Sequence, residues 1–470
     1  MKEVNVAEAG TLSTLIPEDE VYTTTDLKVT GDLNGTDILF LREMAGTDKT
    51  SFPTGGSLAR LDLSGATVKS GGDAYLEEFG VPYYTVDDEI SYNMFYRCMA
   101  LEKIVLPTSV KTIGVEAFRN CTSLSEVVLP DGLKTIGDRA FYYCWNLANI
   151  NLPEGLESIG EDAFWACVFK EITLPSSLTY LDPSAFNSCE SLENVFVEEG
   201  NKAYTSVDGV LFNAAKNKLL LYASGRTASE YSVPEGIDTI SDYSFYFNQN
   251  LVSVKIPTGV KAILESAFNT CTSLEDVDFP EGLSYIGRYG FGSCANLKQI
   301  ILPNSLDSIG ESCFFSCSSV DSLFIPEKLA VIPNSAFSGL GIHRLYIPST
   351  VKKIGESAFW VEDNLTEIYS YAEKPAECHE TAFAMVDDKA CRLLVPKGCV
   401  DAYRANVGFK HFLNIEEMAG GTSGIDNVMG GNAESETAFY GIDGKKLGAK
   451  KRGLNIVRMG DGSVRKVLCK

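Results

Sequence analysis

The sequence has few of the residues and motifs on which enzymes usually depend. Among 470 residues there are only three histidines, His343, His379 and His411. No neighbouring pattern marks any of them as part of a Ser/His/Asp or Cys/His catalytic group. A phosphate-binding loop, a G-x-G-x-x-G fingerprint and an H-E-x-x-H zinc motif are all missing. We therefore expect no catalytic residues, no cofactor and no enzymatic activity.

Long apolar segments and basic charge are also scarce. No stretch approaches the roughly 20 apolar residues that a membrane-spanning helix needs, so no membrane span is expected. Asp and Glu number 63 against 40 Lys and Arg, which gives a formal net charge of −23. Such a field repels nucleic-acid phosphates and anionic lipid headgroups, and we expect neither as a partner. Solubility alone is the simpler explanation of the charge.

An export signal is missing as well. The N-terminal segment MKEVNVAEAGTLSTLIPEDE lacks the basic start, apolar run and cleavage site of a signal peptide. At this point two explanations stay open. The protein is cytoplasmic, or it is a mature chain from which the export signal has been trimmed and to which Met1 has been added.

What the sequence has in abundance is an internal repeat of 22 or 23 residues. Phenylalanine is followed three residues later by cysteine at eight positions, and prolines from Pro107 to Pro348 recur with the same period. We call each such set of equivalent residues a column. Two columns with one period predict a solenoid of stacked coils. The pairs are Phe95/Cys98, Phe118/Cys121, Phe141/Cys144, Phe164/Cys167, Phe186/Cys189, Phe268/Cys271, Phe291/Cys294 and Phe314/Cys317.

One repeat unit, LSEVVLPDGLKTIGDRAFYYCWN at 124–146, shows how a coil is expected to fold. Its first residues alternate between apolar and polar, which predicts a short strand that Pro130 ends. Gly137 is expected to allow a sharp turn. Ala140 and Phe141 are expected to open a helical half-turn that directs the ring into the core. The predicted structural core therefore includes Phe118, Phe141, Phe164, Phe268, Phe291 and Phe314.

The 13 cysteines are interpreted through the same period. Eight of them share one repeat position, so their side chains should run parallel at about the 4.8 Å strand spacing and should not converge as a disulfide requires. We expect buried free thiols. A zinc site at Cys378, His379, Cys391 and Cys399 is not expected, because the ligand spacing fits no common zinc finger.

The repeats resemble those of the BspA-like leucine-rich-repeat family of bacterial surface proteins. The motif L-x-x-I-x-L-P-x-x-L-x-x-I-G-x-x-A-F-x-x-C stands at 101–121 and, with substitutions, at 274–294, and the resemblance covers about 90–417. It implies a secreted or outer-surface protein of host-associated bacteria, often lipid-anchored, with its export signal trimmed. It also implies adhesion to a protein or glycan of the host matrix or of neighbouring bacteria. The ligand, a lipid anchor before residue 1 and the oligomeric state stay open.

The predicted fold is a β-rich repeat solenoid of the leucine-rich-repeat type, a right-handed superhelix with N- and C-terminal caps and a small β-rich C-terminal tail. The role of the tail, which is basic, stays open between a sorting signal and an appendage that docks on the acidic body. The predicted organisation is an N-terminal cap at 1–90, a first repeat array at 91–197, a β-hairpin insertion at 198–233, a second array at 234–371, a C-terminal cap at 372–418, a linker at 419–436 and the tail at 437–470.

Outward-facing strand positions on the inner sheet are the predicted binding surface. Ile301, Phe324, Tyr346 and Tyr369 occupy one such position on consecutive coils, and Phe196 occupies it in the first array. A contiguous apolar stripe often marks an interaction site, although another part of the protein could instead cover it. The sequence therefore favours a binding protein that recognises its partner through this sheet. A structural surface coat or spacer without a ligand is the alternative, and a hydrolase hidden in the N-terminal region is a third hypothesis.

Overall fold

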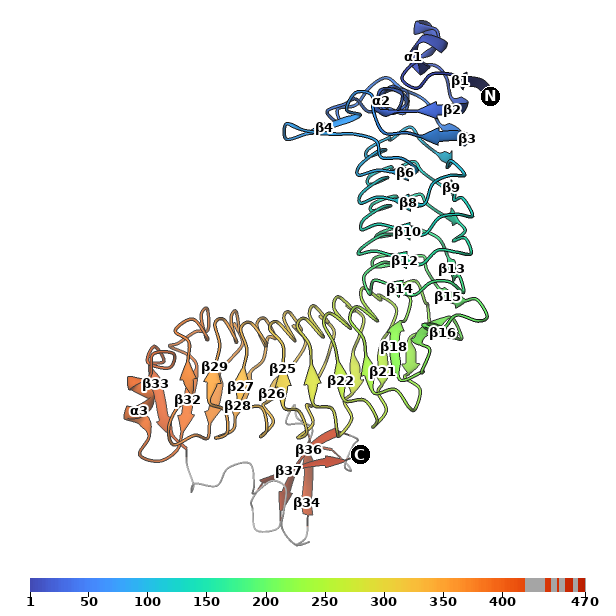
Figure 1. Cartoon of the computed structure of the whole chain (residues 1–470). Helices are drawn as coiled ribbons and strands as arrows, with labels where there is room; N and C mark the ends of the chain where they lie inside the picture. The colour runs from blue at the N-terminus through green and yellow to red at the C-terminus, as the bar shows by residue number, and fades with distance from the viewer. Residues whose placement is uncertain (419–435, 441–445, 448–452, 460–463, 470) are drawn as a thin grey trace. The chain divides into compact units, whose positions relative to one another are not determined.

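The structure is a computed structural model and describes residues 1–418, 436–440, 446–447, 453–459 and 464–469 (Figure 1). The chain divides into two compact units. The first unit comprises Met1–Thr227 and Asp242–Asn248, and the second comprises Ala228–Ser241 and Gln249–Lys470. Most of the predicted linker lies outside the described residues.

The predicted repeat solenoid is confirmed, with coils of about 23 residues. In the first unit each regular coil contributes one short strand to each of two parallel ladders. Residues at equivalent repeat positions pair from coil to coil, as Lys103 does with Glu126. One ladder is β1 (Lys2–Val6), β2 (Asp26–Leu33), β3 (Arg60–Val68), β7 (Lys103–Val105), β9 (Glu126–Val128) and β11 (Asn149–Ile150), continued along the chain by the pair β13 (Glu171–Leu174) and β15 (Asn194–Val197). The other is β6 (Glu89–Ile90), β8 (Thr112–Ile113), β10 (Thr135–Ile136), β12 (Ser158–Ile159) and β14 (Tyr180–Leu181).

The helical half-turn predicted at Ala140 and Phe141 is wrong. Arg139 and Tyr143 have positive φ angles of 53° and 59°, and this conformation interrupts any helix. Alternate N–H groups instead point to the next coil, so that the N–H of Phe141 donates to the carbonyl oxygen of Ala163 at 2.8 Å. The coils are therefore joined at this edge by a third ladder of hydrogen-bonded turns. Among the described residues, no α-helix lies within 45–399.

Gly137 also has a different role from the predicted sharp turn, since its φ angle is not positive. A Cβ atom at this position would lie about 3.0 Å from backbone atoms of Ile113, Gly114 and Val115 in the preceding coil. The glycine column is needed because neighbouring backbones approach each other closely there.

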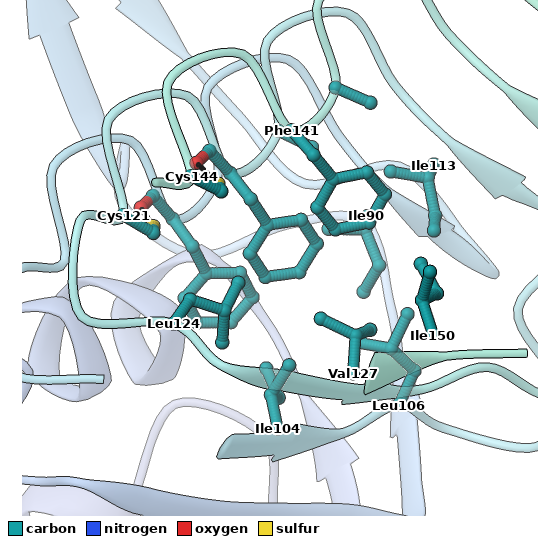
Figure 2. Packing of buried hydrophobic residues seen from close by; sticks show 14 of the residues in the cluster. Ile90, Ile104, Leu106, Ile113, Cys121, Leu124, Val127, Phe141, Cys144 and Ile150 are labelled. Carbon is teal, nitrogen blue, oxygen red and sulfur yellow. Dashed lines mark hydrogen bonds between the residues drawn. The ribbon is translucent and has the colours of Figure 1, made fainter. Parts of the chain in front are cut away.

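The phenylalanine column forms a continuous spine through the core. Ring centroids of Phe118 and Phe141 lie 5.2 Å apart with planes 3° from parallel, and Phe141 and Phe164 repeat this geometry at 5.3 Å and 5°. Figure 2 shows the ring of Phe141 among the inward-facing residues Ile113 and Ile150. The six predicted core phenylalanines are all fully buried.

The cysteine column lies beside this spine, as the neighbouring side chains of Cys121 and Cys144 show in Figure 2. Every cysteine with a described side chain is a free thiol, and all but Cys399 are buried. The thiol of Cys144 donates to the carbonyl oxygen of Phe118 in the preceding coil at 3.1 Å, and the same contact recurs along the column. Cysteine therefore acts here as a small apolar residue with a weak hydrogen-bond donor.

The N-terminal cap continues the first ladder through β1, β2 and β3. It also contains α1 (Leu12–Leu15), a short 3-10 helix (Glu18–Glu20), α2 (Gly35–Met44) and a hairpin of β4 (Leu76–Glu78) and β5 (Val81–Tyr83). Asn34 caps α2, because its side chain accepts from the N–H of Thr36 while the Asp37 carboxylate accepts from the N–H of Asn34. Within the cap, β2, α2 and β3 therefore follow one another as strand, helix and strand.

Beyond β15, the first unit contains β16 (Tyr204–Val207), β17 (Val210–Asn213) and β18 (Lys218–Leu221), which pair antiparallel in sequence order. Asp208 and Gly209 form the turn of the β16–β17 hairpin with φ angles of 50° and 75°. Tyr222 then occupies a position of the phenylalanine column, with its ring 5.0 Å from that of Phe245. A tyrosine thus stands where the sequence pattern shows a gap.

The second unit repeats the two-strand coil and contains α3 (Val400–Ala405). One set of parallel strands comprises β19 (Glu230–Ser232), β21 (Ser253–Lys255) and β23 (Asp276–Asp278), and another comprises β26 (Ser322–Phe324), β28 (Arg344–Ile347), β30 (Glu367–Ser370), β32 (Arg392–Val395) and β33 (Asn414–Glu417). The second strands of the coils are β20 (Thr239–Ile240), β22 (Ala262–Ile263), β24 (Tyr285–Ile286) and β25 (Ser308–Ile309), then β27 (Val331–Ile332), β29 (Lys353–Ile354) and β31 (Glu377–Cys378).

The described part of the tail contains four strands, as expected for a β-rich segment. They form an antiparallel sheet in the order β35, β34, β36, β37. Their bounds are β34 (Glu436–Tyr440), β35 (Lys446–Leu447), β36 (Gly453–Met459) and β37 (Val464–Cys469).

Candidate functional site

Three of the predicted stripe residues lie together on the inner sheet of the second unit. Phe324 on β26 pairs with Tyr346 on β28, which pairs with Tyr369 on β30. The ring centroids of Phe324 and Tyr346 are 4.2 Å apart, and those of Tyr346 and Tyr369 are 4.8 Å apart. The planes are 12° and 8° from parallel, and all three side chains are partly exposed. We call these three residues the aromatic stripe.

The strand alternation explains why the rings face outward. Leu323, Leu345 and Ile368 precede the three aromatic residues and are fully buried in the core. Neighbouring residues of a strand point to opposite faces, so the aromatic side chains lie on the outer surface of the sheet. The next residue in register is Leu394, which is 8% exposed, and the stripe ends there.

A row of alternating charges flanks the aromatic stripe. Arg392 bridges Glu367 and Glu416 at 3.1 and 2.8 Å, and Arg344 contacts Glu367 at 3.3 Å. The hydrogen bond from Arg392 lowers the pKa of Glu416. Burial, together with the hydrogen bond that its hydroxyl donates to Glu367, raises the pKa of Tyr369 to about 12. The stripe therefore presents neutral tyrosine hydroxyls beside fixed charges of both signs.

Ile301 and Phe196 do not join this group. Ile301 is partly exposed but lies in a segment between β24 and β25 that forms no strand. Phe196 is 41% exposed on β15, where it pairs with Thr173, and it belongs to the first unit.

Metal binding finds no support in the side chains of the described residues. Among them, no group of three or more His, Cys, Asp or Glu side chains could hold a metal ion. Cys378 is buried and its pKa is raised to about 12 by burial, while His379 contacts Thr381 through Nδ1. What the stripe can do is offer apolar ring edges and hydrogen-bonding groups to a partner.

The structure also shows aromatic side chains that sequence reasoning missed. Tyr142, Trp165 and Tyr246 lie in contact at the turn edge of the first unit, where the third hydrogen-bonded ladder runs. They lie in turns and not at outward strand positions. The signal that could have found them is that all three directly follow a phenylalanine of the spine column.

Comparison with known proteins is consistent with this architecture. The profile of the family described as "BspA type Leucine rich repeat region" matches residues 88–216 and 238–366. A leucine-rich repeat protein from Eubacterium ventriosum shares 19% identity over 74% of this chain and 85% of its own, with a TM-score of 0.53. The pneumococcal vaccine antigen PcpA shares 22% identity over 84% of this chain and 79% of its own, with a TM-score of 0.51.

A leucine rich cell surface protein from Faecalibacterium prausnitzii shares 24% identity over 63% of this chain and 78% of its own, with a TM-score of 0.49. No protein with a curated functional description matches the chain. Within the residues that the structure describes, no helix has both the length and the apolar character needed to cross a membrane.

Proposed function

Because the chain belongs to the BspA-type leucine-rich-repeat family, we propose that it is a non-enzymatic binding protein, secreted or displayed on the bacterial cell surface. Its partner is a protein or glycan of the host matrix or of neighbouring bacteria. The surface location rests on the family, whose members resemble bacterial cell-surface proteins. The partner is recognised through the inner sheet of the second unit.

The observation that carries this proposal is the stacking of Phe324, Tyr346 and Tyr369 on one sheet face. Aromatic side chains are enriched in the energetic centres of interfaces, where a polar rim surrounds an apolar patch. The charged row from Arg344 to Glu416 supplies such a rim. Since the rings hold one another in place, little side-chain entropy is lost when a partner binds.

A structural coat or spacer without a ligand is the second candidate. The observation that favours it is the same ring stacking, because each ring contacts the ring on the next coil and so stabilises the solenoid. The two candidates differ in what removal of the rings should change.

The test is capture of purified host-matrix proteins and arrayed glycans by the immobilised chain. The double variant Phe324→Ala with Tyr346→Ala should abolish capture while thermal unfolding stays nearly unchanged. Val128→Ala, at the same outward strand position on β9, is the matched control and should bind like the wild type. Capture that survives in the double variant would move the site elsewhere, and no capture by the wild type would favour the structural role.

A further inference from the structure

A second aromatic surface lies on the turn edge of the first unit, away from the strands. Residues that directly follow the spine phenylalanines stack along this edge, and two more rings flank them. We call this set the turn-edge band: Tyr96, Arg119, Tyr142, Tyr143, Trp145, Trp165 and Tyr246. Trp145 is 55% exposed and the other members are partly exposed.

The band is held together by ring contacts between coils. The centroid of Trp165 lies 5.7 Å from that of Tyr142 and 5.9 Å from that of Tyr246. Tyr143 packs edge-on against Tyr142 at 4.4 Å and against Trp145 at 5.6 Å. Tryptophan, tyrosine and arginine are the residues most enriched in interface hot spots, and here they form one preorganised group.

One position of the band is already occupied by a guanidinium group, that of Arg119. The guanidinium carbon of Arg119 lies 5.7 Å from the ring centroid of Tyr96 and 5.7 Å from that of Tyr142. Its Nη1 atom forms an ion pair with Glu116 at 3.0 Å. This edge of the first unit therefore already binds one arginine side chain between two aromatic rings and a carboxylate.

Asp162 supplies a carboxylate beside the remaining rings that is only loosely paired with a cation. Asp162 directly precedes the Ala163–Phe164 pair of its coil, and burial raises its pKa. The backbone carbonyl oxygen of Asp162 accepts a hydrogen bond from the N–H of Trp165 at 3.0 Å, so this residue lies beside the band. Burial is the main cause of the raised pKa values of Tyr142 and Tyr246, and the charge of Asp162 adds to both. Its one ion-pair contact is a long one, 3.6 Å to Nε of Arg139, whose guanidinium also binds Glu161.

We propose that the turn-edge band is a second binding surface, which takes arginine side chains from a basic segment of a protein partner. The rings of Tyr143 and Trp145 offer apolar and π surface, and Asp162 offers a carboxylate that is incompletely neutralised within the chain. The net charge of −23 attracts a basic segment at long range. A neutral glycan is a poorer fit, because it gains nothing from the carboxylate of Asp162 or from the net negative charge of the chain.

The test uses the full chain and short labelled peptides in which glycine alternates with arginine, lysine or citrulline. Fluorescence anisotropy at low and moderate salt gives the affinities. The arginine peptide should bind more tightly than the lysine peptide, because a guanidinium stacks on aromatic faces, and the neutral citrulline peptide should not bind. Trp145→Ala and Asp162→Asn should each weaken arginine-peptide binding roughly five- to tenfold, as expected for loss of a cation–π or charge contact.

Matched controls separate this site from general electrostatics and from the aromatic stripe. Trp360→Ala removes a comparably exposed tryptophan, 43% exposed, from the second unit, and Glu281→Gln removes an exposed carboxylate there. Both should bind like the wild type, and so should the Phe324→Ala, Tyr346→Ala double variant. Equal binding of arginine and lysine peptides, unaffected by Trp145→Ala and Asp162→Asn, would overturn the proposal. It would also be overturned if the chain bound neutral dextran through Trp145 and did not bind the arginine peptide.

Discussion

The hydroxyl group of Tyr75 donates a hydrogen bond to the carbonyl oxygen of Tyr92 at 2.6 Å. In later coils the equivalent carbonyl accepts from the N–H of the preceding coil, as that of Val115 accepts from Asn93. The first coil has no such predecessor in the ladder. Arg42 on α2 supplies the other missing donors, since its guanidinium binds the carbonyl oxygens of Met94 and Tyr96 at 3.0 and 3.4 Å. Side chains of the cap thus supply the hydrogen-bond donors that the backbone of a preceding coil supplies elsewhere.

This role predicts a large cost for Arg42→Met. The substitution leaves the carbonyl groups of Met94 and Tyr96 without a donor, and each such group costs about 1–3 kcal/mol. We expect the free energy of unfolding of the first unit to fall by about 3 kcal/mol or more, measured by urea denaturation followed through the fluorescence of Trp145 and Trp165. The surface variant Arg139→Met should cost less than about 1 kcal/mol. Similar losses in the two variants would contradict the role of Arg42.

The spine predicts a cavity cost at Phe268. This ring is fully buried and stacks on Phe291 at 4.8 Å, 6° from parallel. Phe268→Ala should lower the free energy of unfolding by about 3–5 kcal/mol, because the cavity cannot fully collapse. Chemical denaturation followed through Trp360 measures the change, and the exposed Val331→Ala in the same unit is the control. A loss below about 1 kcal/mol at Phe268 would show that the ring is not part of the core.

The cysteine column predicts thiols that are present but protected. Burial raises the pKa of Cys98 and Cys189 to about 12, so almost no reactive thiolate forms at neutral pH. With an alkylating reagent and no reductant, the native protein should label first at the less buried Cys399. After unfolding, all cysteines of the column should label. Mass spectrometry of the peptides distinguishes this result from abundant disulfides, which would be incompatible with the parallel column.

The sequence pattern predicted the solenoid because residues that recur at one repeat position are those that contact each other when the coils stack. Phe118, Phe141 and Phe164 stack as their 23-residue spacing requires. The position of the aromatic stripe follows from the same spacing and the strand alternation. Its ring geometry does not, because the tilt of Tyr346 against Phe324 depends on side-chain rotamers that a one-dimensional pattern does not contain.

Other features escaped the pattern for separate physical reasons. Tyr222 was missed because a tyrosine replaces phenylalanine within an insertion that breaks the period. Arg42 was missed because its partners lie about 50 residues away in the chain, and such a contact leaves no local signal. The second strand of each coil, such as Thr135–Ile136, is only two residues long, and so short a strand shows no alternation of apolar and polar residues in the sequence. The turn-edge band has different residue types at the same repeat position. No constant residue therefore marks it in the sequence.

Glu362 predicts a pH dependence of stability in the second unit. It stands where the column has cysteine elsewhere, is fully buried, and accepts hydrogen bonds from the N–H groups of Leu340 and Gly341 at 2.7 and 2.8 Å. Burial raises its pKa to about 7 from 4.5, although these donors partly oppose the shift. The folded state therefore binds the proton more tightly than the unfolded state, and stability is lost as pH rises from about 4.5 through about 7.

The variant Glu362→Gln isolates this contribution because glutamine does not titrate. Across that pH range the free energy of unfolding of the wild type should fall relative to the variant by about 3 kcal/mol, from about 1.4 kcal/mol per pKa unit. Denaturation of both proteins at a series of pH values measures the difference. Parallel pH profiles for the wild type and the variant would show that the carboxyl group does not titrate as described.

The stacking of coils is tested most directly by a double-mutant cycle on Phe118 and Phe141, whose rings lie 5.2 Å apart. The measurement compares the free energies of unfolding of Phe118→Leu, Phe141→Leu and the double variant with that of the wild type. Stacked rings predict a coupling energy of about 0.5–1.5 kcal/mol. The pair Phe118 and Phe186, three coils apart on the same spine, should show almost none. A coupling for Phe118 and Phe141 no larger than for that distant pair would contradict the stacked solenoid on which both binding proposals depend.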